Sequence, residues 1–520
     1  MESTSRNLEV YAHFLGANDG VVTGSATIVK IVRNGVTRNI LVDYGLFQGE
    51  HEELNDNRYI SGDDIDAVLL THAHLDHCGG IPLLVQSRNG NIPFTGKIYA
   101  SPETIKQATM ILVDTAKINE RKKGDNSEKL RREENRLIRK KEKAIRENCK
   151  SQEIEALDSA ISSIEDTANE VGYTMEEVEE VFSRFVPVKV TTNQNDEVSI
   201  FEGIDAKFEP MNHINGACKI TLIAHLGDEK FEIVFTGDIG KRDSILYRNI
   251  PATPNYEVGA IVMESLHGDD YEIETVNESI AKLRSVIRDA TRKQKVVIIP
   301  TFSMDRSAMI LRVLNDFLDQ GMHFKLVFDT PLGFRMLNSY IDDYNNDSAW
   351  FKYAKGFPFR LDRVSVILDY QSHMIASKAS GPAVFITSSG MGNGGRVLDY
   401  FEHHIQDDKA VFVFPGFLCE NTPARRLVEA SKGELLEIQG NRYKKNCETV
   451  WLHGFSSHGY IRDKIDVMTQ YPNASQVYLV HGDDVSIEGT FANIRAYNEA
   501  FEHVERNIVI PTYDEVVRLY

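Results

Sequence analysis

Short runs of apolar residues that end in polar or glycine-rich segments recur along the whole chain. Runs of about four to eight such residues are typical of buried strands, and the stretches between them are predicted as helices. Strands that alternate with helices predict an α/β protein, in which ligands collect beyond the carboxyl ends of the strands. The runs predicted as strands are 39–43, 65–70, 231–238, 260–264, 296–300, 325–329, 383–387 and 477–481.

One segment departs from this pattern. Residues 117–150 contain 14 Lys and Arg against 7 Asp and Glu, whereas 151–180 contain 10 Asp and Glu and no Lys or Arg. Heptad spacing of apolar residues predicts an antiparallel helical hairpin over about 117–172, with a basic arm against an acidic arm. Either the basic arm binds RNA or a partner, or the hairpin is a self-neutralised surface coiled coil. A further helix is expected to start at Thr174, where Thr174 and Glu177 form a capping box.

Composition narrows the class of protein. A length of 520 residues predicts two to four domains. No apolar span is long enough to cross a bilayer and the first residues lack a signal-peptide core, so a cytoplasmic protein with no membrane partner is expected. The net charge of −19 argues against nucleic-acid binding by the whole surface, but it permits a local groove.

The strongest chemical signal follows the run 65–70. His72, His74, Asp76 and His77 fall within six residues, at the point where the apolar strand gives way to polar side chains. Imidazole nitrogens suit zinc, and a carboxylate adds a hard oxygen ligand. Four ligands this close exceed what one tetrahedral site with an open position needs, which predicts a pair of metals. A chance cluster on a solvated loop is the alternative, and it is rare at this composition.

This cluster is part of a longer series of motifs. It is preceded by 14–17, 22–25 and 42–49 and followed by 212–217 and 236–238, in an order that resembles the metallo-β-lactamase fold. Motifs at 264–265, 329–332, 388–396, 455–458 and 480–483 resemble the β-CASP subgroup of that fold, which are nucleases with an inserted α/β domain.

The resemblance implies an αββα sandwich with an inserted β-CASP α/β domain. The first part of the metallo-β-lactamase domain would span 1–265, with the helical hairpin as an insertion. The β-CASP domain would span 266–445, and the last part of the metallo-β-lactamase domain 446–520.

The resemblance also implies roles for single residues. His72, His74, His213 and Asp238 would hold one metal, and Asp76, His77, His481 and the shared Asp238 would hold the other. Asp43 would orient a ligand histidine. Glu264 and His458 would form the acid–base pair near the leaving group, and Asp76 is counted with them as catalytic. A ligand set rich in imidazole and without thiolate suits two Zn²⁺ per chain, with Mn²⁺ as a substitute.

The glycine-rich motif is expected to contact RNA phosphates through Ser389, Gly390, Gly394, Gly395 and Arg396. The alternative is a tight turn between a strand and a helix. Arg306, Arg425 and Arg426 are further candidates for phosphate contacts. Leu266-His267-Gly268 stands where the subgroup usually has Thr-Tyr-Gly, which puts the local acid–base detail in doubt.

The predicted function is a two-zinc ribonuclease that hydrolyses phosphodiester bonds of single-stranded RNA. Three alternatives stay open: a metallohydrolase of small esters or thioesters, a DNA-directed nuclease of the same fold, and a non-catalytic scaffold. His481 argues against the DNA-repair type, which usually lacks a histidine there. A homodimer and a partner bound through the 117–172 hairpin are further expectations. The sequence does not distinguish internal from end-directed cleavage.

Overall fold

The computed structural model describes residues 8–58, 60–87, 91–121, 140, 172–190, 196–249, 254–270, 274–346, 350–352, 358–502 and 505–520. Most of the predicted 117–172 hairpin lies outside these residues. The helix predicted to start at Thr174 is confirmed as α5, with the backbone N–H of Thr174 donating to the Glu177 carboxylate. Each run predicted as a strand contains one.

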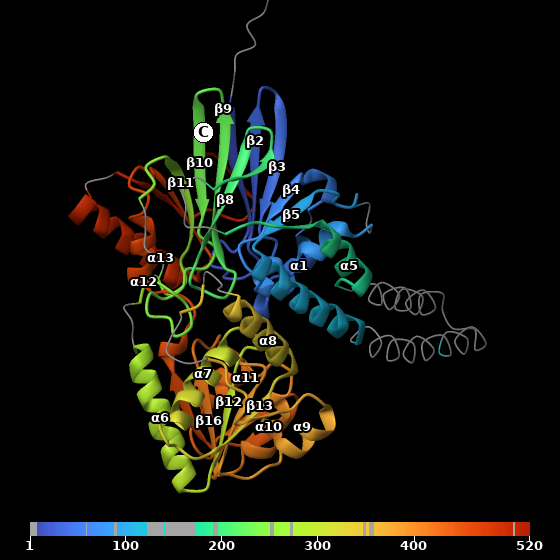
Figure 1. Cartoon of the computed structure of the whole chain (residues 1–520), viewed down its shortest axis with the longest axis vertical. Helices are drawn as coiled ribbons and strands as arrows, with labels where there is room; N and C mark the ends of the chain where they lie inside the picture. Colours follow the sequence, from blue (N-terminus) through green and yellow to red (C-terminus); the bar gives the residue numbers. More distant parts are fainter. Residues whose placement is uncertain are drawn as a thin grey trace, which may run out of the picture.

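Two seven-stranded sheets form the upper part of the molecule (Figure 1). In the first sheet, the three strand pairs at one end are antiparallel and the three pairs at the other end are parallel. Its order is β22 (Glu515–Arg518), β1 (Leu8–Gly16), β2 (Ala26–Arg33), β3 (Val36–Val42), β4 (Ala67–Leu69), β5 (Lys97–Ala100) and β6 (Phe185–Pro187). The order of the second sheet is β21 (Asn507–Val509), β20 (Gln476–Val480), β11 (Val258–Glu264), β10 (Glu229–Phe235), β9 (Cys218–Leu226), β8 (Ile204–Pro210) and β7 (Val198–Phe201).

Alternate residues of these strands face opposite sides, as the pleat of a strand requires. Ile220 and Leu222 of β9 and Ile233 of β10 belong to the core between the two sheets. Val234, the next residue of β10, faces the other way and packs in the core under the outer helices. The helices of this part are α1 (Leu54–Asn57), α2 (Leu75–Cys78), 102–121, α5 (Met175–Arg184), α12 (Ile461–Met468) and α13 (Asp484–Tyr497). This arrangement confirms the predicted four-layer sandwich.

A third sheet with its own helices lies below the sandwich (Figure 1). All its strand pairs are parallel, in the order β14 (Val364–Val366), β13 (Lys325–Asp329), β15 (Ala383–Thr387), β12 (Val296–Pro300), β16 (Ala410–Pro415) and β19 (Glu448–Leu452). Its helices are α6 (Val276–Arg292), α7 (Arg306–Asp319), α8 (Pro331–Asn345), α9 (Tyr370–Ala376), α10 (Val397–His404) and α11 (Pro423–Glu429). A separate hairpin pairs β17 (Leu435–Ile438) with β18 (Asn441–Lys444).

The third sheet reaches past residue 445, where the sequence predicted that the inserted domain ends. The difference arises because β19 pairs with β16 along its whole length and so completes this sheet. Helix α6 illustrates how a helix of this unit buries one side, because its buried residues Val276, Leu283 and Ile287 recur on one face. No helix among the described residues combines the length and the apolar character needed to cross a membrane.

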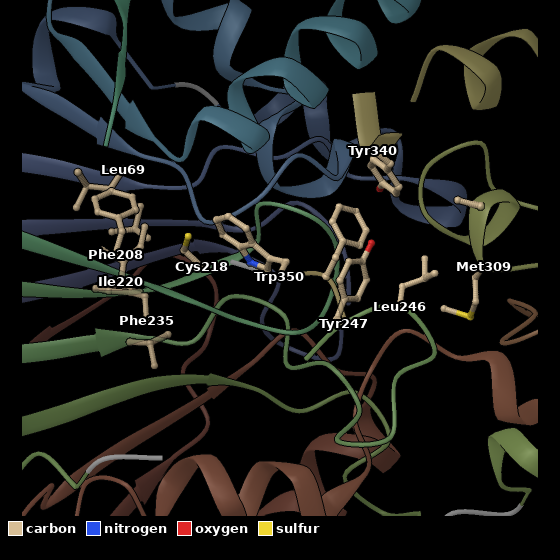
Figure 2. Close-up of a cluster of buried hydrophobic side chains, with 14 of the residues drawn as sticks. Leu69, Phe208, Cys218, Ile220, Phe235, Leu246, Tyr247, Met309, Tyr340 and Trp350 are labelled. Atoms are coloured by element: carbon tan, nitrogen blue, oxygen red, sulfur yellow. The ribbon is translucent and has the colours of Figure 1, made fainter. Parts of the chain in front are cut away.

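A continuous buried cluster joins the sandwich to the third-sheet unit (Figure 2). Trp350 lies at its centre, with 2% of its surface exposed, and its indole N–H donates to the Ala217 carbonyl at 2.8 Å. On the sandwich side of Trp350 the cluster contains Leu69, Phe208, Cys218, Ile220 and Phe235, and on the other side Leu246, Tyr247, Met309 and Tyr340. The two units are therefore packed together by apolar side chains next to the 211–217 loop.

Asp305 is a buried carboxylate at the same junction. It accepts a hydrogen bond from the Tyr247 hydroxyl, while its Oδ2 has no hydrogen-bond partner among the described residues. Burial raises the pKa of Asp305 to about 6, although the Tyr247 hydroxyl and the Arg306 charge oppose the shift. The folded protein therefore binds this proton more tightly than the unfolded chain does.

We expect Asp305→Asn to stabilise the protein in a pH-dependent way. Because the folded pKa lies above the unfolded one, ionising Asp305 costs nothing below about pH 4 and costs up to about 3 kcal/mol above pH 6. Asparagine keeps the acceptor oxygen but never ionises, so its advantage should grow between pH 4.5 and 7.5. Urea unfolding at both pH values measures this, with exposed Asp408→Asn as control. An advantage of equal size at both pH values would contradict the expectation.

Candidate metal centre

The predicted site residues converge at one edge of the sandwich because they follow the carboxyl ends of neighbouring strands. Asp43 directly follows β3, His72 lies three residues after the end of β4, and Asp238 lies three residues after the end of β10. Glu264 is the last residue of β11, and His481 follows β20. The pairs β3–β4, β10–β11 and β11–β20 are parallel, so these strands end on the same side of their sheets.

Backbone contacts fix the loops that carry these residues. The N–H of Cys218 donates to the Thr71 carbonyl at 2.9 Å, which ties the end of the 211–217 loop to the segment after β4. Gly237 has a φ of +54°, and a Cβ there would lie 2.9 Å from the Cβ of Thr71. Only glycine therefore lets Asp238 turn towards the histidines. The N–H of His481 donates to the Ala17 carbonyl.

The carboxylate of Asp238 lies at the centre of the site, and each of its oxygens faces a different set of imidazoles. Oδ2 lies 3.3 Å from His72 Nε2, 3.3 Å from His213 Nε2, 4.0 Å from His74 Nδ1 and 3.9 Å from His458 Nδ1. Oδ1 lies 3.2 Å from His77 Nε2 and 3.5 Å from His481 Nε2. One carboxylate thus separates two ligand sets, the geometry of a bridging ligand.

The first set is His72, His74, His213 and Asp238, whose potential ligand atoms all lie within 4.8 Å of one another. His74 Nδ1 is 3.1 Å from His72 Nε2 and 3.2 Å from His213 Nε2. Burial lowers the pKa of His72 to about 4 and that of His213 well below its ordinary value, so both imidazoles are neutral. Three ring nitrogens facing one another cannot all donate, and a cation among them satisfies their lone pairs.

The second set is Asp76, His77 and His481, which also lie within 4.8 Å of one another. Burial lowers the pKa of His481. Burial raises the pKa of Asp76, but the neighbouring His77 and His481 outweigh it and hold the pKa below its ordinary value. Oδ1 of Asp238 is buried and has no hydrogen-bond partner among the described residues. The Asp76 carboxylate, the His481 imidazole and the Asp238 Oδ1 without a hydrogen-bond partner among the described residues are suited to bind a second divalent cation.

Asp43 orients one of these histidines. Its Oδ2 lies 2.8 Å from His77 Nδ1, so Nε2 of the ring points at Asp238. The Asp43 carboxylate is itself fixed by the backbone N–H and the hydroxyl of Thr71, both at 2.7 Å. Burial lowers the pKa of His77, but Asp238 and Asp43 more than compensate and the pKa lies well above its ordinary value.

Glu264 and His458 form a hydrogen-bonded pair beside the two ligand sets. Glu264 Oε2 lies 2.9 Å from His458 Nδ1. Burial lowers the pKa of His458, but the Glu264 carboxylate outweighs it and raises the pKa above its ordinary value. A half-buried imidazole whose carboxylate partner favours the protonated form suits a general acid.

Lys464 completes this pair, and the sequence prediction missed it. Its side chain is fully buried, and its Nζ donates to Glu264 Oε1 at 3.3 Å and to the Gly459 carbonyl at 2.8 Å. The sequence pattern that could have predicted its burial is its spacing in α12, because Ile461, Lys464 and Val467 lie three residues apart on the buried face. A lysine in an apolar stripe is a candidate for a buried ion pair.

We expect Lys464→Met to lower the free energy of unfolding by about 3 kcal/mol, because it removes the ammonium group that faces Glu264 Oε1 and leaves the buried carboxylate with His458 as its one remaining partner of opposite charge among the described residues. Adding Glu264→Gln to this variant should recover part of the loss, since no uncompensated charge then remains. Urea denaturation of both variants tests this. Lys432→Met, at an exposed position, serves as the control and should change stability by less than about 0.5 kcal/mol. A loss no larger than in the control would contradict the role of Lys464.

The glycine-rich motif forms a tight turn between β15 and α10. The Ser389 hydroxyl donates to the Gly394 carbonyl at 3.0 Å, and Gly395 has a φ of +76°. A phosphate contact by Ser389, Gly390, Gly394 and Gly395 stays a prediction. The guanidinium of Arg396 donates to the buried carboxylate of Asp329 and to the carbonyls of Ile367 and Leu368, and its phosphate contact likewise stays a prediction.

Two of the other three candidate arginines also have internal partners. Arg306 is buried and donates to the Pro415 carbonyl and to the Ser457 hydroxyl, so it supports the segment that carries His458. Arg425 donates to Glu429. Arg426 is exposed.

Three sequence families match this chain. Residues 19–93 match the metallo-beta-lactamase superfamily, 307–427 the Beta-Casp domain, and 442–501 the Zn-dependent metallo-hydrolase RNA specificity domain. The first and third matches contain the residues of the ligand sets near His72 and His481. The second match lies on the unit built around the third sheet.

Individual relatives are similar over most of the chain. A ribonuclease of Thermus thermophilus is 24% identical over 89% of this chain and 91% of its own length. The RNase J-like protein of Methanocaldococcus jannaschii is 23% identical over 85% of this chain and 87% of its own. The transcription termination factor FttA of Methanosarcina mazei is 23% identical over 86% of this chain, which spans 63% of that factor.

Proposed function

Because this chain belongs to the β-CASP subgroup of metallo-β-lactamase-fold nucleases, we propose that it is a ribonuclease that hydrolyses phosphodiester bonds of single-stranded RNA with two zinc ions. The observation that carries the proposal is the carboxylate of Asp238. Its two oxygens face two separate sets of ligands, which is the arrangement that a pair of adjacent cations needs.

In this proposal, His72, His74 and His213 hold one cation, and Asp76, His77 and His481 hold the other, with Asp238 shared between them. A pair of divalent cations held by these residues would supply a water molecule of lowered pKa and positive charge for the phosphate. Zinc is the metal that the imidazole-rich set favours, and Mn²⁺ is a substitute.

The chain itself supplies the proton for the departing oxygen. Nδ1 of His458 is occupied by Glu264, so Nε2 is the nitrogen left to donate to the substrate. Lys464 holds Glu264, and Glu264 fixes the orientation of the ring and favours its protonated form by raising the pKa of His458. Asp43 acts at a distance by holding His77 in the orientation that directs Nε2 to the site.

RNA is favoured over the other substrates by the comparisons. The match to an RNA specificity domain at 442–501 contains both His458 and His481, and two relatives that match over most of both chains are ribonucleases by name. A cytoplasmic location, a homodimer and partner binding through the 117–172 hairpin remain predictions.

The test compares His74→Ala with wild type on single-stranded RNA, DNA of the same sequence and a small thioester. We expect the variant to hydrolyse RNA at least about 100-fold more slowly, because a metal ligand is lost. His13→Ala is the matched control, since His13 pairs with Asp514 at the sheet edge, outside both ligand sets. Equal RNA hydrolysis by wild type and His74→Ala, or turnover of the thioester with no action on RNA, would overturn the proposal.

A further inference from the structure

A cavity of about 620 Å³ opens beside His458. Its walls come from the turn after β11, the start of α13, and the 417–420 and 451–460 segments that follow β16 and include the end of β19. His267 connects it to the metal centre, because the ring centre of His267 lies 6.4 Å from that of His458. The volume is sufficient for a nucleoside.

The cavity contains several aromatic rings, of which one is free to stack on a planar ligand. Phe417 is 38% exposed, and its one ring contact among the described residues is edge-to-face with His267, with the ring centres 5.7 Å apart. Trp451 is covered by His453, with ring centres 4.3 Å apart, and by the Arg425 guanidinium at 4.7 Å. Phe417 is therefore the stacking surface.

The charges on the cavity wall exclude a phosphate. The lining carboxylates are Asp269, Asp270, Glu420, Asp483 and Asp484, against the single arginine Arg425. That arginine already donates to Glu429. An anionic group would be repelled here, whereas the hydrogen-bond donors of a neutral ligand would be accepted.

The carboxylates are also not arranged for a metal. Among the described residues, none of these side chains belongs to a close group of three potential metal ligands. Asp483 accepts a hydrogen bond from the N–H of Ser486 at 2.8 Å, and Asp269 accepts one from its hydroxyl at 3.3 Å. The Asp270 carboxylate is less engaged, because its ion-pair partner in the described part of the chain, His267 Nδ1, is 3.9 Å from its Oδ2.

We propose that this cavity binds a guanine base of the RNA substrate, next to the scissile bond on the side of His458. Phe417 stacks on the base, and the Asp270 carboxylate accepts the hydrogen bonds of its N1–H and exocyclic amino group. Guanine is the base whose pairing edge presents two adjacent donors, the pattern that a carboxylate matches. Uracil instead presents one donor between two acceptors. The inference rests on the proposed function, because it assigns the cavity to the same substrate.

The first experiment maps cleavage of end-labelled oligoadenylates that carry one guanosine, inosine or uridine at the same internal position. Inosine lacks the exocyclic amino group. We expect cleavage next to guanosine to be at least about 10-fold faster than next to inosine or uridine, the discrimination typical of a bidentate contact. Asp270→Asn and Phe417→Ala should each reduce this ratio towards one. Glu437→Gln, an exposed carboxylate on β17, should keep it.

The second experiment measures binding without turnover, using the full chain in the presence of a chelator. The two tryptophans make fluorescence selective, because Trp350 is buried while Trp451 lines the cavity. Guanosine should quench the emission with a dissociation constant at least about 10-fold below those of inosine and uridine. Asp270→Asn should remove this difference.

The outcomes separate this inference from the proposed function. RNA cleavage without base preference, together with equal quenching by the three nucleosides, would overturn the guanine pocket while the ribonuclease stands. Quenching by spermidine or Mg²⁺ but not by guanosine would also overturn it. Selective binding of guanosine by a chain that cleaves no RNA would contradict the proposed function and still support a guanine site.

Discussion

Replacing Asp238 with asparagine should reduce RNA hydrolysis by at least about 1000-fold. Loss of an outer partner of a metal ligand typically costs 10- to 100-fold, and Asp238 is proposed to touch both cations. The substitution keeps the shape of the side chain but removes its charge, so both ligand sets lose their shared anion. The buried His77 also loses one of the two carboxylates that raise its pKa.

The measurement for Asp238→Asn is the initial rate of cleavage of a single-stranded RNA at saturating zinc. Asp228→Asn provides the control, because Asp228 is exposed in the turn at the other end of the same β9–β10 hairpin. Circular dichroism confirms that both variants fold. Activity in Asp238→Asn within about 10-fold of wild type would contradict a shared ligand at this position.

The second large effect is expected for His458→Ala, which should lower kcat by about 100- to 10,000-fold with little change in bound metal. This range is that of a general acid that protonates a leaving group. The geometry places His458 in contact distance of Asp238 as well as Glu264, so metal content distinguishes a proton donor from a ligand. His323→Ala, at an exposed position, is the control.

A substrate with sulfur in place of the departing oxygen sharpens this test. A thiolate leaves without a proton, so it should restore most of the rate lost in His458→Ala but none of the rate lost in Asp238→Asn. A defect of equal size with the oxygen and sulfur substrates would contradict the role of His458 as the proton donor, whatever the loss in rate.

Much of this architecture follows from local patterns in the sequence. Apolar runs such as 296–300 and 383–387 are buried on both faces in a parallel sheet, and such strands read clearly as continuous apolar segments. The cluster at 72–77 can also be recognised from the sequence alone, because one short segment supplies His72, His74, Asp76 and His77. The distant residues His213, Asp238 and His481, which we propose as ligands, could be placed only through the resemblance to the subgroup.

Other features depend on tertiary contacts that the sequence does not reveal. Arg396 lies in a motif that suggests phosphate binding, but the buried carboxylate of Asp329 draws its guanidinium inwards. Lys464 is an ordinary charged residue until folding buries it against Glu264. β19 joins the third sheet although the sequence assigned it to the sandwich, because pairing partners are set by topology and not by strand propensity.

The most direct test of the central claim is anomalous diffraction from crystals of the wild-type chain, recorded on both sides of the zinc absorption edge. We predict two peaks separated by a few ångströms, one among His72, His74 and His213 and the other among Asp76, His77 and His481, with Asp238 between them. A single peak, or peaks away from Asp238, would contradict the two-cation centre on which the proposed ribonuclease activity depends.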